Sequence, residues 1–524
     1  MGMPHPFGSR RALAPLAAAL ALVFGMGAAA SALAQEEGRA PNRDKMMELL
    51  DKLKEKGIIS EEEFNDITGN TPEGRAAARA ERRTRVQKEA LDAQKAEQAK
   101  ERLNGRWNNG LTFETPDRRT SFTLGGRVHA DYRYFDQDYA ASTFDIRRAY
   151  LTLQGKWNEW LTWDLTGDFA QSGTALDVGW VNAAWSDKLQ VRAGQFKMPF
   201  SLEELTSSRF IDFQERSFVN RIAPAKERGV MVHGVPYTGV TYAVALSNGQ
   251  GKNNNETSPK FDSPDVIGRA TVNVAELLQQ QARAVYHFGA AFSSGEFSTN
   301  ATTTAVSGSS TLLNGGGQTE PRGFTFMPAP SFTSPSVDRT RYGFETALAY
   351  GPFKLQGEIA QSNFKGRTTT SPSNSFDKSI DAWYLSLHWM ITGERYADTY
   401  RNGVFGRMSP ITPFEPGGSG SGAWELAARF SEFDATDFPL VAGATCAPAG
   451  TGCVNVGNLA KPTGTNKATA LTLGLKWIWT PNFKIYLNYV DTKFGNTIFS
   501  TPTGGTEFSS DRERAVTMRA AFDW

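Results

Sequence analysis

The chain has 524 residues, of which 40% are hydrophobic, and its 56 basic residues nearly balance its 55 acidic residues. Because the charges balance, overall charge indicates no partner, and we expect no nucleic-acid binding. Outside the N-terminus the sequence has no apolar run of about 18 residues or more, which excludes a transmembrane helix, so a membrane protein of this sequence would have to be a β-barrel.

Residues 1–34 are predicted to be a secretory signal peptide. Arg10 and Arg11 precede a stretch rich in Ala and Leu, and residues 32–34 form an A-x-A cleavage motif before Gln35. The two arginines lack the rest of a twin-arginine motif, so we expect export by the ordinary secretory route. The mature chain is therefore expected to leave the cytoplasm.

Residues 35–104 are predicted to form a helical periplasmic segment. Ser60 can cap one helix, and Glu63 can complete a capping box. Residues 50–67 resemble a short oligomerisation motif, and residues 75–103 consist almost entirely of Ala, Arg, Lys, Glu and Gln. The apolar stripe of this last stretch is thin, so the sequence leaves open a trimeric coiled coil, a tether and a solvated or disordered stalk.

Residues 105–524 are predicted to form one large barrel. From Ser121 onward, about sixteen segments alternate apolar and polar residues, as strands with one face in lipid and one in water do. In the final segment, Val516 and Phe522 have the apolar parity and Arg519 has the other. Tryptophans gather near strand ends on the apolar parity, where an outer-membrane barrel has its aromatic girdles. The predicted fold class is all-β, an antiparallel transmembrane barrel of about sixteen strands preceded by a helical segment.

The connections between these segments are of two kinds. Short turns alternate with long polar loops, notably residues 293–337 and 435–461, so we expect short turns in the periplasm and long loops outside. Residues 393–422 are the exception, because they are long where a short periplasmic turn is expected. Cys446 and Cys453 lie in one long loop without a nearby histidine, which favours a disulfide over a metal site, and no cofactor is expected.

Four stretches of the barrel carry longer motifs. They read RRAYL at 147–151, RAGQFK at 192–197 followed by PFSLEELTSSR at 199–209 and ER at 215–216, WMITGE at 389–394, and GAWELAARF at 422–430. Together they resemble the phosphate- and polyphosphate-selective porin family, porins O and P. The resemblance implies a homotrimeric sixteen-stranded porin in the Gram-negative outer membrane, surrounded by its lipid. It also implies a third loop folded into the lumen and a path lined by Arg and Lys for phosphate or pyrophosphate.

Strand parity assigns many basic side chains to the lumen wall. The arginines of this set are Arg127, Arg148, Arg192, Arg269, Arg283, Arg341, Arg429 and Arg519. Bases outnumber acids roughly two to one on the lumen parity, which would favour anions in a water-filled pore. Arg also suits phosphate because its planar fork can bond two oxygens. The alternative is that each arginine pairs with a lumen acid and only stiffens the wall.

Residues 201–228 are too polar and too long for a strand, and they lie where the family has its constriction loop. The basic residues expected to contact anions there are Arg209, Arg216, Arg221, Lys226 and Arg228. The same stretch contains several acidic residues, so the loop is not basic overall. Such a loop could hold a transverse field, which suits a general pore as well as an anion-specific one.

The predicted function is an outer-membrane porin that lets phosphate or polyphosphate diffuse through an anion-preferring channel. The alternative within this class is a general or other-anion porin without phosphate specificity. An enzyme would need a nucleophile beside a histidine, and His129, His233, His287 and His388 lie in no such motif. A third class is a tether that binds peptidoglycan through the N-terminal segment.

Overall fold

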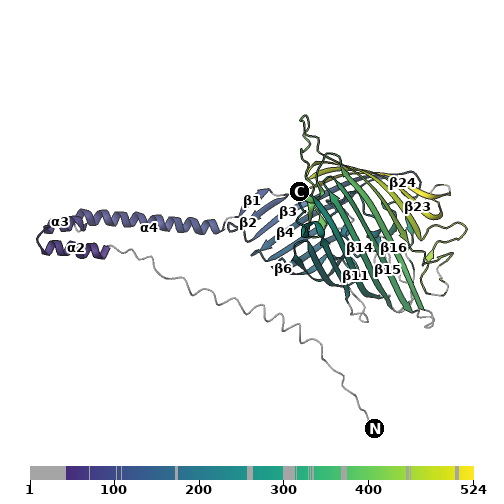
Figure 1. The fold of residues 1–524 in the computed structure, drawn as a ribbon, viewed down its shortest axis with the longest axis horizontal. Helices are drawn as coiled ribbons and strands as arrows, with labels where there is room; N and C mark the ends of the chain where they lie inside the picture. Colours follow the sequence, from purple (N-terminus) through teal and green to yellow (C-terminus); the bar gives the residue numbers. More distant parts are fainter. Residues whose placement is uncertain are drawn as a thin grey trace, which may run out of the picture. The chain divides into compact units, whose positions relative to one another are not determined.

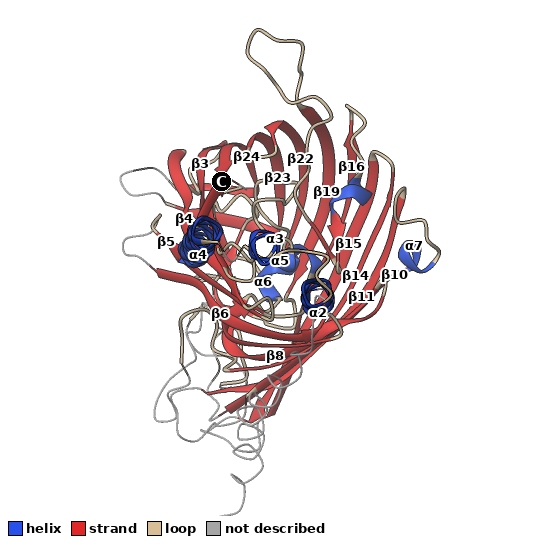
Figure 2. Cartoon of the chain, turned by 90° about the vertical axis from the view of Figure 1, so that its left-hand side faces the viewer, coloured by secondary structure: helices blue, strands red, loops and turns tan. Residues whose placement is uncertain are grey.

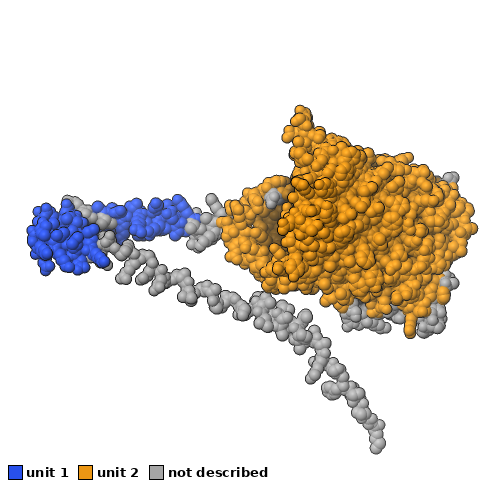
Figure 3. Space-filling view, viewed as in Figure 1, with its two compact units in different colours: residues 1–99 blue, residues 100–524 orange. Residues whose placement is uncertain are grey.

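The computed structural model describes residues 43–69, 71–101, 103–107, 109–170, 175–255, 264–298, 313, 316–328, 330, 332, 336–367, 375–443, 446, 448, 450–501, 505 and 507–524. The predicted signal peptide lies outside these residues. Among the helices in these ranges, none is long and apolar enough to cross a membrane. The chain divides into two compact units, residues 1–99 and residues 100–524 (Figure 3).

The first unit is helical. Its described helices are α2 (Arg43–Glu55), α3 (Glu61–Ile67) and α4 (Pro72–Glu101). The predicted capping box is confirmed at the start of α3. The Ser60 hydroxyl accepts a hydrogen bond from the Glu63 amide at 3.1 Å, and the Glu63 carboxylate accepts one from the Ser60 amide at 2.8 Å, which lowers the pKa of Glu63. Phe64 is buried, whereas Met46 and Leu49 are 53% and 54% exposed, so part of the apolar surface of α2 faces solvent.

The second unit is an antiparallel β-barrel with sixteen strands among the described residues (Figure 1). The barrel strands are β3 (Ser121–Phe135), β4 (Thr143–Trp157), β5 (Leu161–Asp168), β6 (Ala175–Ser186), β7 (Leu189–Lys197), β8 (Lys226–Tyr237), β9 (Val240–Ser247), β10 (Asp265–Asn273), β11 (Ala284–Ser298), β14 (Ser336–Tyr350), β15 (Phe353–Arg367), β16 (Ser375–Met390), β19 (Ala423–Asp434), β22 (Lys467–Thr480), β23 (Phe483–Ser500) and β24 (Phe508–Asp523). Each strand pairs with the next, and β24 pairs with β3 to close the barrel. A hairpin of β1 (Asn104–Trp107) and β2 (Leu111–Glu114) precedes β3. The predicted fold class is confirmed.

The barrel closes at a seam between its first and last strands. Trp524 and Gly126 exchange two backbone hydrogen bonds of 3.0 and 3.1 Å, and β2 continues the pairing with β3 beyond them, from Ser121 to Leu124. A Cβ atom at position 126 would collide with the Trp524 indole, so glycine is needed there. The C-terminal aromatic residue is therefore part of the seam.

Side chains alternate between two faces as the sequence predicts. On β24, Val516 and Phe522 are 38% and 45% exposed on the outer face, whereas Thr517 and Arg519 on the inner face are 2% and 1% exposed. Most connections at the end of the barrel where β3 begins are short, one of them containing α7 (Val274–Leu277), whereas the opposite end carries the long loops. The end with short turns therefore faces the periplasm.

Three connections fold into the barrel from its two ends. The connection between β7 and β8, residues 198–225, is called the constriction loop below, and its helices α5 (Leu202–Leu205) and α6 (Val219–Ile222) lie inside the ring of strands (Figure 2). The second inward segment comes from the extracellular end and contains β12 (Gly317–Gln318) and β13 (Thr325–Met327). The third comes from the periplasmic end and contains η1 (Tyr396–Thr399), β17 (Tyr400–Arg401) and β18 (Val404–Phe405).

The packing of the long periplasmic connection between β16 and β19 explains its length. Tyr396, Tyr400 and Phe405 are buried in one cluster with Leu202 of the constriction loop. The Tyr400 hydroxyl also lies 2.6 Å from Nδ1 of His287 on the barrel wall. A short turn could not reach these partners, so the length of the connection follows from its fold into the lumen.

Aromatic side chains fill part of the lumen near the extracellular end. The loop between β19 and β22 contains β20 (Leu440–Val441), β21 (Val454–Asn455) and a disulfide that joins Cys446 to Cys453. Phe438 of this loop packs on Phe332 and Phe364, with ring centroids 5.7 and 6.1 Å apart. Any open path for ions therefore lies elsewhere in the lumen.

Candidate anion path

Two cavities inside the barrel meet beside the constriction loop. The outer cavity, about 300 Å³, is lined by extracellular residues such as Gly251 and Lys252, and the inner cavity, about 610 Å³, by residues near the periplasmic end such as His233. Six residues line both cavities: Arg148, Tyr150, Asp177, Glu204, Arg216 and Lys226. Basic side chains outnumber acidic ones in the lining of each cavity. The two cavities together therefore form a basic space beside the constriction loop, which is the candidate anion path.

Three wall arginines on this path make no ion pair among the described residues. Arg148 is 6% exposed, and its Nη1 atom has no hydrogen-bond partner there. The Arg127 guanidinium donates to the Ser208 hydroxyl at 2.8 Å and lies 4.1 Å from the ring centre of Tyr150. Arg192 lies 4.1 Å from the ring centre of Trp180. These guanidinium groups keep donors that a passing anion can use.

Four other predicted wall arginines are held by acids. Their carboxylate partners are Glu345 for Arg269, Asp265 at 3.3 Å for Arg341, Glu203 at 3.1 Å and Glu320 at 2.7 Å for Arg429, and Asp131 at 2.6 Å and Glu215 at 2.8 Å for Arg519. The alternative interpretation, that lumen arginines stiffen the wall, describes these four. Arg429 and Arg519 in particular attach the constriction loop to the barrel.

The basic residues of the constriction loop have different surroundings. Arg216 donates to three backbone carbonyls of the loop and pairs with Glu204 at 3.2 Å, so it shapes the loop as well as lining both cavities. Arg209 lines the inner cavity, and burial lowers its pKa to about 10, so it stays charged at neutral pH. Arg221 lines the outer cavity and donates to the Thr319 carbonyl at 3.0 Å, which joins the loop to the inward extracellular segment.

Comparisons with known proteins show the family of this chain. The model of the family described as phosphate-selective porin O and P matches residues 122–524. The protein belongs to this family. The porin is also 25% identical over 407 residues to Porin O of Pseudomonas aeruginosa, covering 73% of this chain and 85% of that relative.

Several solved structures resemble the porin at low identity. The outer-membrane channel DcaP of Acinetobacter baumannii has a TM-score of 0.43 and 10% identity, covering 79% of this chain and 99% of that one. OmpT of Vibrio cholerae has a TM-score of 0.43 and 11% identity, covering 78% and 98%. By its family and fold the porin is a β-barrel channel of the Gram-negative outer membrane, and the family consists of channels rather than enzymes.

Three of the predicted site residues lie elsewhere than expected. Lys226 and Arg228 belong to β8, so the predicted loop boundary at residue 228 is wrong by three residues. Lys226 still reaches the path and bonds Asp177 at 2.7 Å. Arg228 has the parity of outward-facing Val230, lines neither cavity and donates a hydrogen bond to Asn255 of the loop between β9 and β10, so it is not on the path. Arg283 is exposed in the periplasmic turn before β11 and is not a residue of the wall.

Sequence parity also missed residues that do face the path. Arg147 lines the outer cavity beside Arg148, although neighbours on a regular strand face opposite sides. The register shows why: His129 pairs with Arg148 and Ala130 with Ile146, so Arg147 is the extra residue of a β-bulge. Lys252 and Arg322 also line this cavity, and they come from loops, where strand parity gives no information.

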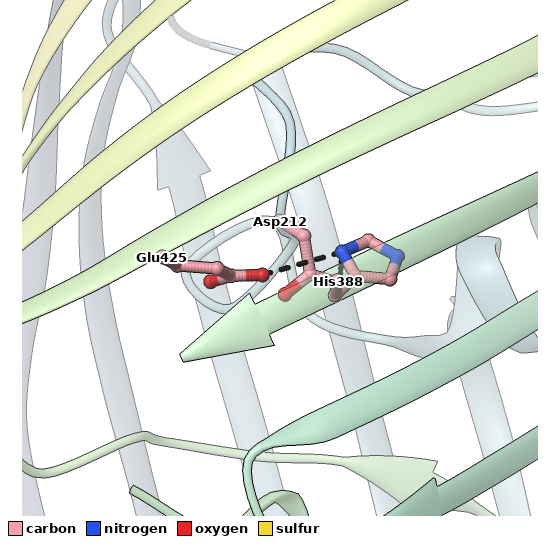
Figure 4. A group of neighbouring side chains, drawn as sticks. All are labelled: Asp212, His388 and Glu425. Carbon is pink, nitrogen blue, oxygen red and sulfur yellow. Dashed lines mark hydrogen bonds and ion pairs between the residues drawn. The ribbon is translucent and has the colours of Figure 1, made fainter. Parts of the chain in front are cut away.

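One cluster of the lumen has the composition of a metal site. Asp212 at the tip of the constriction loop lies beside His388 and Glu425 of the wall, as Figure 4 shows. However, the ammonium groups of Lys354 and Lys476 lie 2.6 and 3.0 Å from the two Asp212 oxygens, and Lys476 also contacts Glu425. These two lysines hold the pKa of Asp212 well below its usual value. Because they occupy the oxygens that a cation would need, the cluster anchors the loop tip.

Proposed function

We propose that the porin is an anion-preferring channel that admits phosphate or polyphosphate by diffusion. The observation that carries this proposal is the junction of the two cavities, where the Nη1 atom of the buried Arg148 guanidinium has no hydrogen-bond partner in the described part of the chain. A buried donor without a partner costs free energy, so an anion with several acceptor oxygens gains from meeting it. Arg216 and Lys226 line the same junction, although both are already engaged with acids.

Further bases extend this junction in both directions. Arg192, Arg209 and Arg127 follow on the periplasmic side, and Arg322 and Lys252 on the extracellular side. Conduction requires that an ion bind strongly enough to enter and weakly enough to leave. A series of moderate sites satisfies this requirement better than one deep pocket, and the spread of bases over two cavities is such a series.

Phosphate specificity is the finer part of the proposal. It is supported by the family name, by the 25% identity to Porin O, and by arginines whose forks can bond two oxygens of one phosphate. The alternative is a general anion porin, in which the same bases only set the sign of the potential. The two functions differ in whether phosphate blocks the chloride current.

The test is a planar-bilayer measurement on single channels. Millimolar phosphate should inhibit the chloride current of the wild-type porin at low ionic strength, and Arg148→Gln should weaken that inhibition severalfold. Arg228→Gln changes an arginine that lines neither cavity, so it is the matched control and should behave as the wild type. A chloride current unaffected by phosphate would reduce the function to that of a general anion porin.

The assembly is proposed on separate grounds. The porin is expected to form a homotrimer surrounded by outer-membrane lipid, and the exposed apolar residues Met46 and Leu49 of α2 are available for contacts between subunits. Residues 35–104 would then support the trimer through helical packing rather than close the pore. Residues 1–34 are proposed to be removed on export.

A further inference from the structure

The outer face of β23 and β24 changes abruptly from apolar to charged near the extracellular end. Tyr489 and Val516 are cross-strand partners and are both exposed on the apolar band. The next outward pair is Asp491 with Arg514, and the one after it is Lys493 with Arg512. These charges therefore lie where the hydrocarbon of the outer leaflet ends and its headgroups begin.

The cross-strand pairing within this charged group places two basic side chains opposite each other. Lys493 and Arg512 are directly opposite each other on one face, and like charges in that position destabilise a sheet. Asp491 contacts Arg512 at 2.9 Å and Arg514 at 4.0 Å, and Asp136 contacts Arg514 at 3.5 Å. Lys493 is exposed and makes no ion pair in the described part of the chain. The group thus has three bases and two acids, with one base left over.

Two other basic residues of this rim, Lys365 and Lys467, are matched by acids, unlike Lys493. Lys365 pairs with Asp377 at 2.9 Å. Lys467 contacts both Glu432 at 3.0 Å and Asp434 at 2.7 Å. These two lysines therefore provide a comparison for the group on β23 and β24, in which one base has no acidic partner among the described residues.

We propose that Lys493, Arg512 and Arg514 bind a phosphate group of the phosphorylated glycolipid that forms the outer leaflet. Two guanidinium groups and one ammonium group can hold the oxygens of a phosphate, and the bound dianion removes the repulsion between Lys493 and Arg512. The apolar surface around Tyr489 and Val516, just below, lies at the depth of the acyl chains. The site is on the outside of the barrel, so it does not depend on the proposed anion path.

The test compares lipid binding by variants in detergent. The purified porin is titrated with lipid A that carries both phosphates, with dephosphorylated lipid A, and with inorganic phosphate as a competitor. The double variant Lys493→Ala/Arg512→Gln should bind the phosphorylated lipid about tenfold more weakly than the wild type, because two charged contacts are lost. The control Lys365→Ala/Lys467→Ala should bind within about twofold of the wild type, since those lysines are outside the proposed site.

The outcomes distinguish a lipid site from a site for free anions. Equal binding of phosphorylated lipid A by the wild type and the double variant would overturn the proposal. Equal binding of the two lipids by the wild type would also overturn it, as would full displacement by millimolar inorganic phosphate, which would indicate a site for free anions. Wild-type conductance of the double variant would show that it is folded. If it fails to fold, the single variant Lys493→Ala, which breaks no ion pair, should still weaken binding severalfold.

Discussion

Replacing Arg429 by Met should detach two inward segments from the barrel wall. The guanidinium bonds Glu203 of the constriction loop at 3.1 Å and Glu320 of the inward extracellular segment at 2.7 Å, and it donates to the Glu215 carbonyl at 3.2 Å. Arg429 is 2% exposed, and Met leaves both carboxylates buried without this partner. Breaking a buried pair by removing one member costs about 3–5 kcal/mol, so the free energy of unfolding should fall by that amount at neutral pH.

The effect should depend on pH with a definite sign. Burial raises the pKa of Glu203 even with Arg429 in place, and loss of the guanidinium raises it further. A carboxyl whose pKa is higher in the folded state binds more protons when folded. The variant should therefore be closest to the wild type below the unfolded pKa of about 4.3, and should lose stability as the pH rises through the folded pKa.

Urea unfolding in detergent micelles, followed by tryptophan fluorescence at pH 4 and pH 7, measures both effects. Single-channel recording should also show a noisier open current, because the loop has lost an attachment. Arg228→Met removes an arginine that contacts Asn255 rather than a buried carboxylate and serves as the control, with an expected change below about 1 kcal/mol. An Arg429→Met porin as stable as this control at neutral pH would refute the reasoning.

Three further perturbations have clear expectations. Deleting residues 35–103 should leave single-pore conductance unchanged and lower the temperature at which the trimer dissociates in detergent; a large rise in conductance would instead identify the segment as a plug. Gly126→Val should slow barrel closure in a refolding assay, because its side chain would collide with Trp524, and folding at the wild-type rate would show that the seam tolerates a side chain there. Replacing Cys446 and Cys453 by Ser should lower the unfolding free energy by no more than about 3 kcal/mol, since the two cysteines are only 7 residues apart in the sequence, with anion preference unchanged.

The barrel could be predicted from the sequence because a period of two is visible in any strand that separates lipid from water. The same parity predicted that arginines such as Arg127 and Arg519 face the lumen, because the strands that carry them are regular at these positions. Parity failed at the β-bulge of β4, which turns Arg147 into the lumen beside Arg148. It also failed at the ends of strands. The constriction loop was predicted to end three residues too late, so Arg228 was assigned to the loop although it belongs to β8.

What lies inside the barrel was harder to predict than the barrel itself. The position of Arg322 on the path depends on an extracellular segment that folds inward, and no periodicity records that fold. The packing of Tyr396 and Phe405 on Leu202 joins segments far apart in the sequence, and only the structure brings them together. Such long-range contacts also decide which arginines are neutralised by acids. The sequence alone therefore could not tell the arginines that stiffen the wall from those that face the anion path.

The reversal potential of the open channel in a potassium chloride gradient tests the central claim most directly. An anion path through the junction of the two cavities predicts a sign that corresponds to chloride preference in the wild type, a clear reduction of that preference in Arg148→Gln, and no change in Arg228→Gln. A cation-selective sign in the wild type, or equal reversal potentials in the wild type and Arg148→Gln, would contradict such a path.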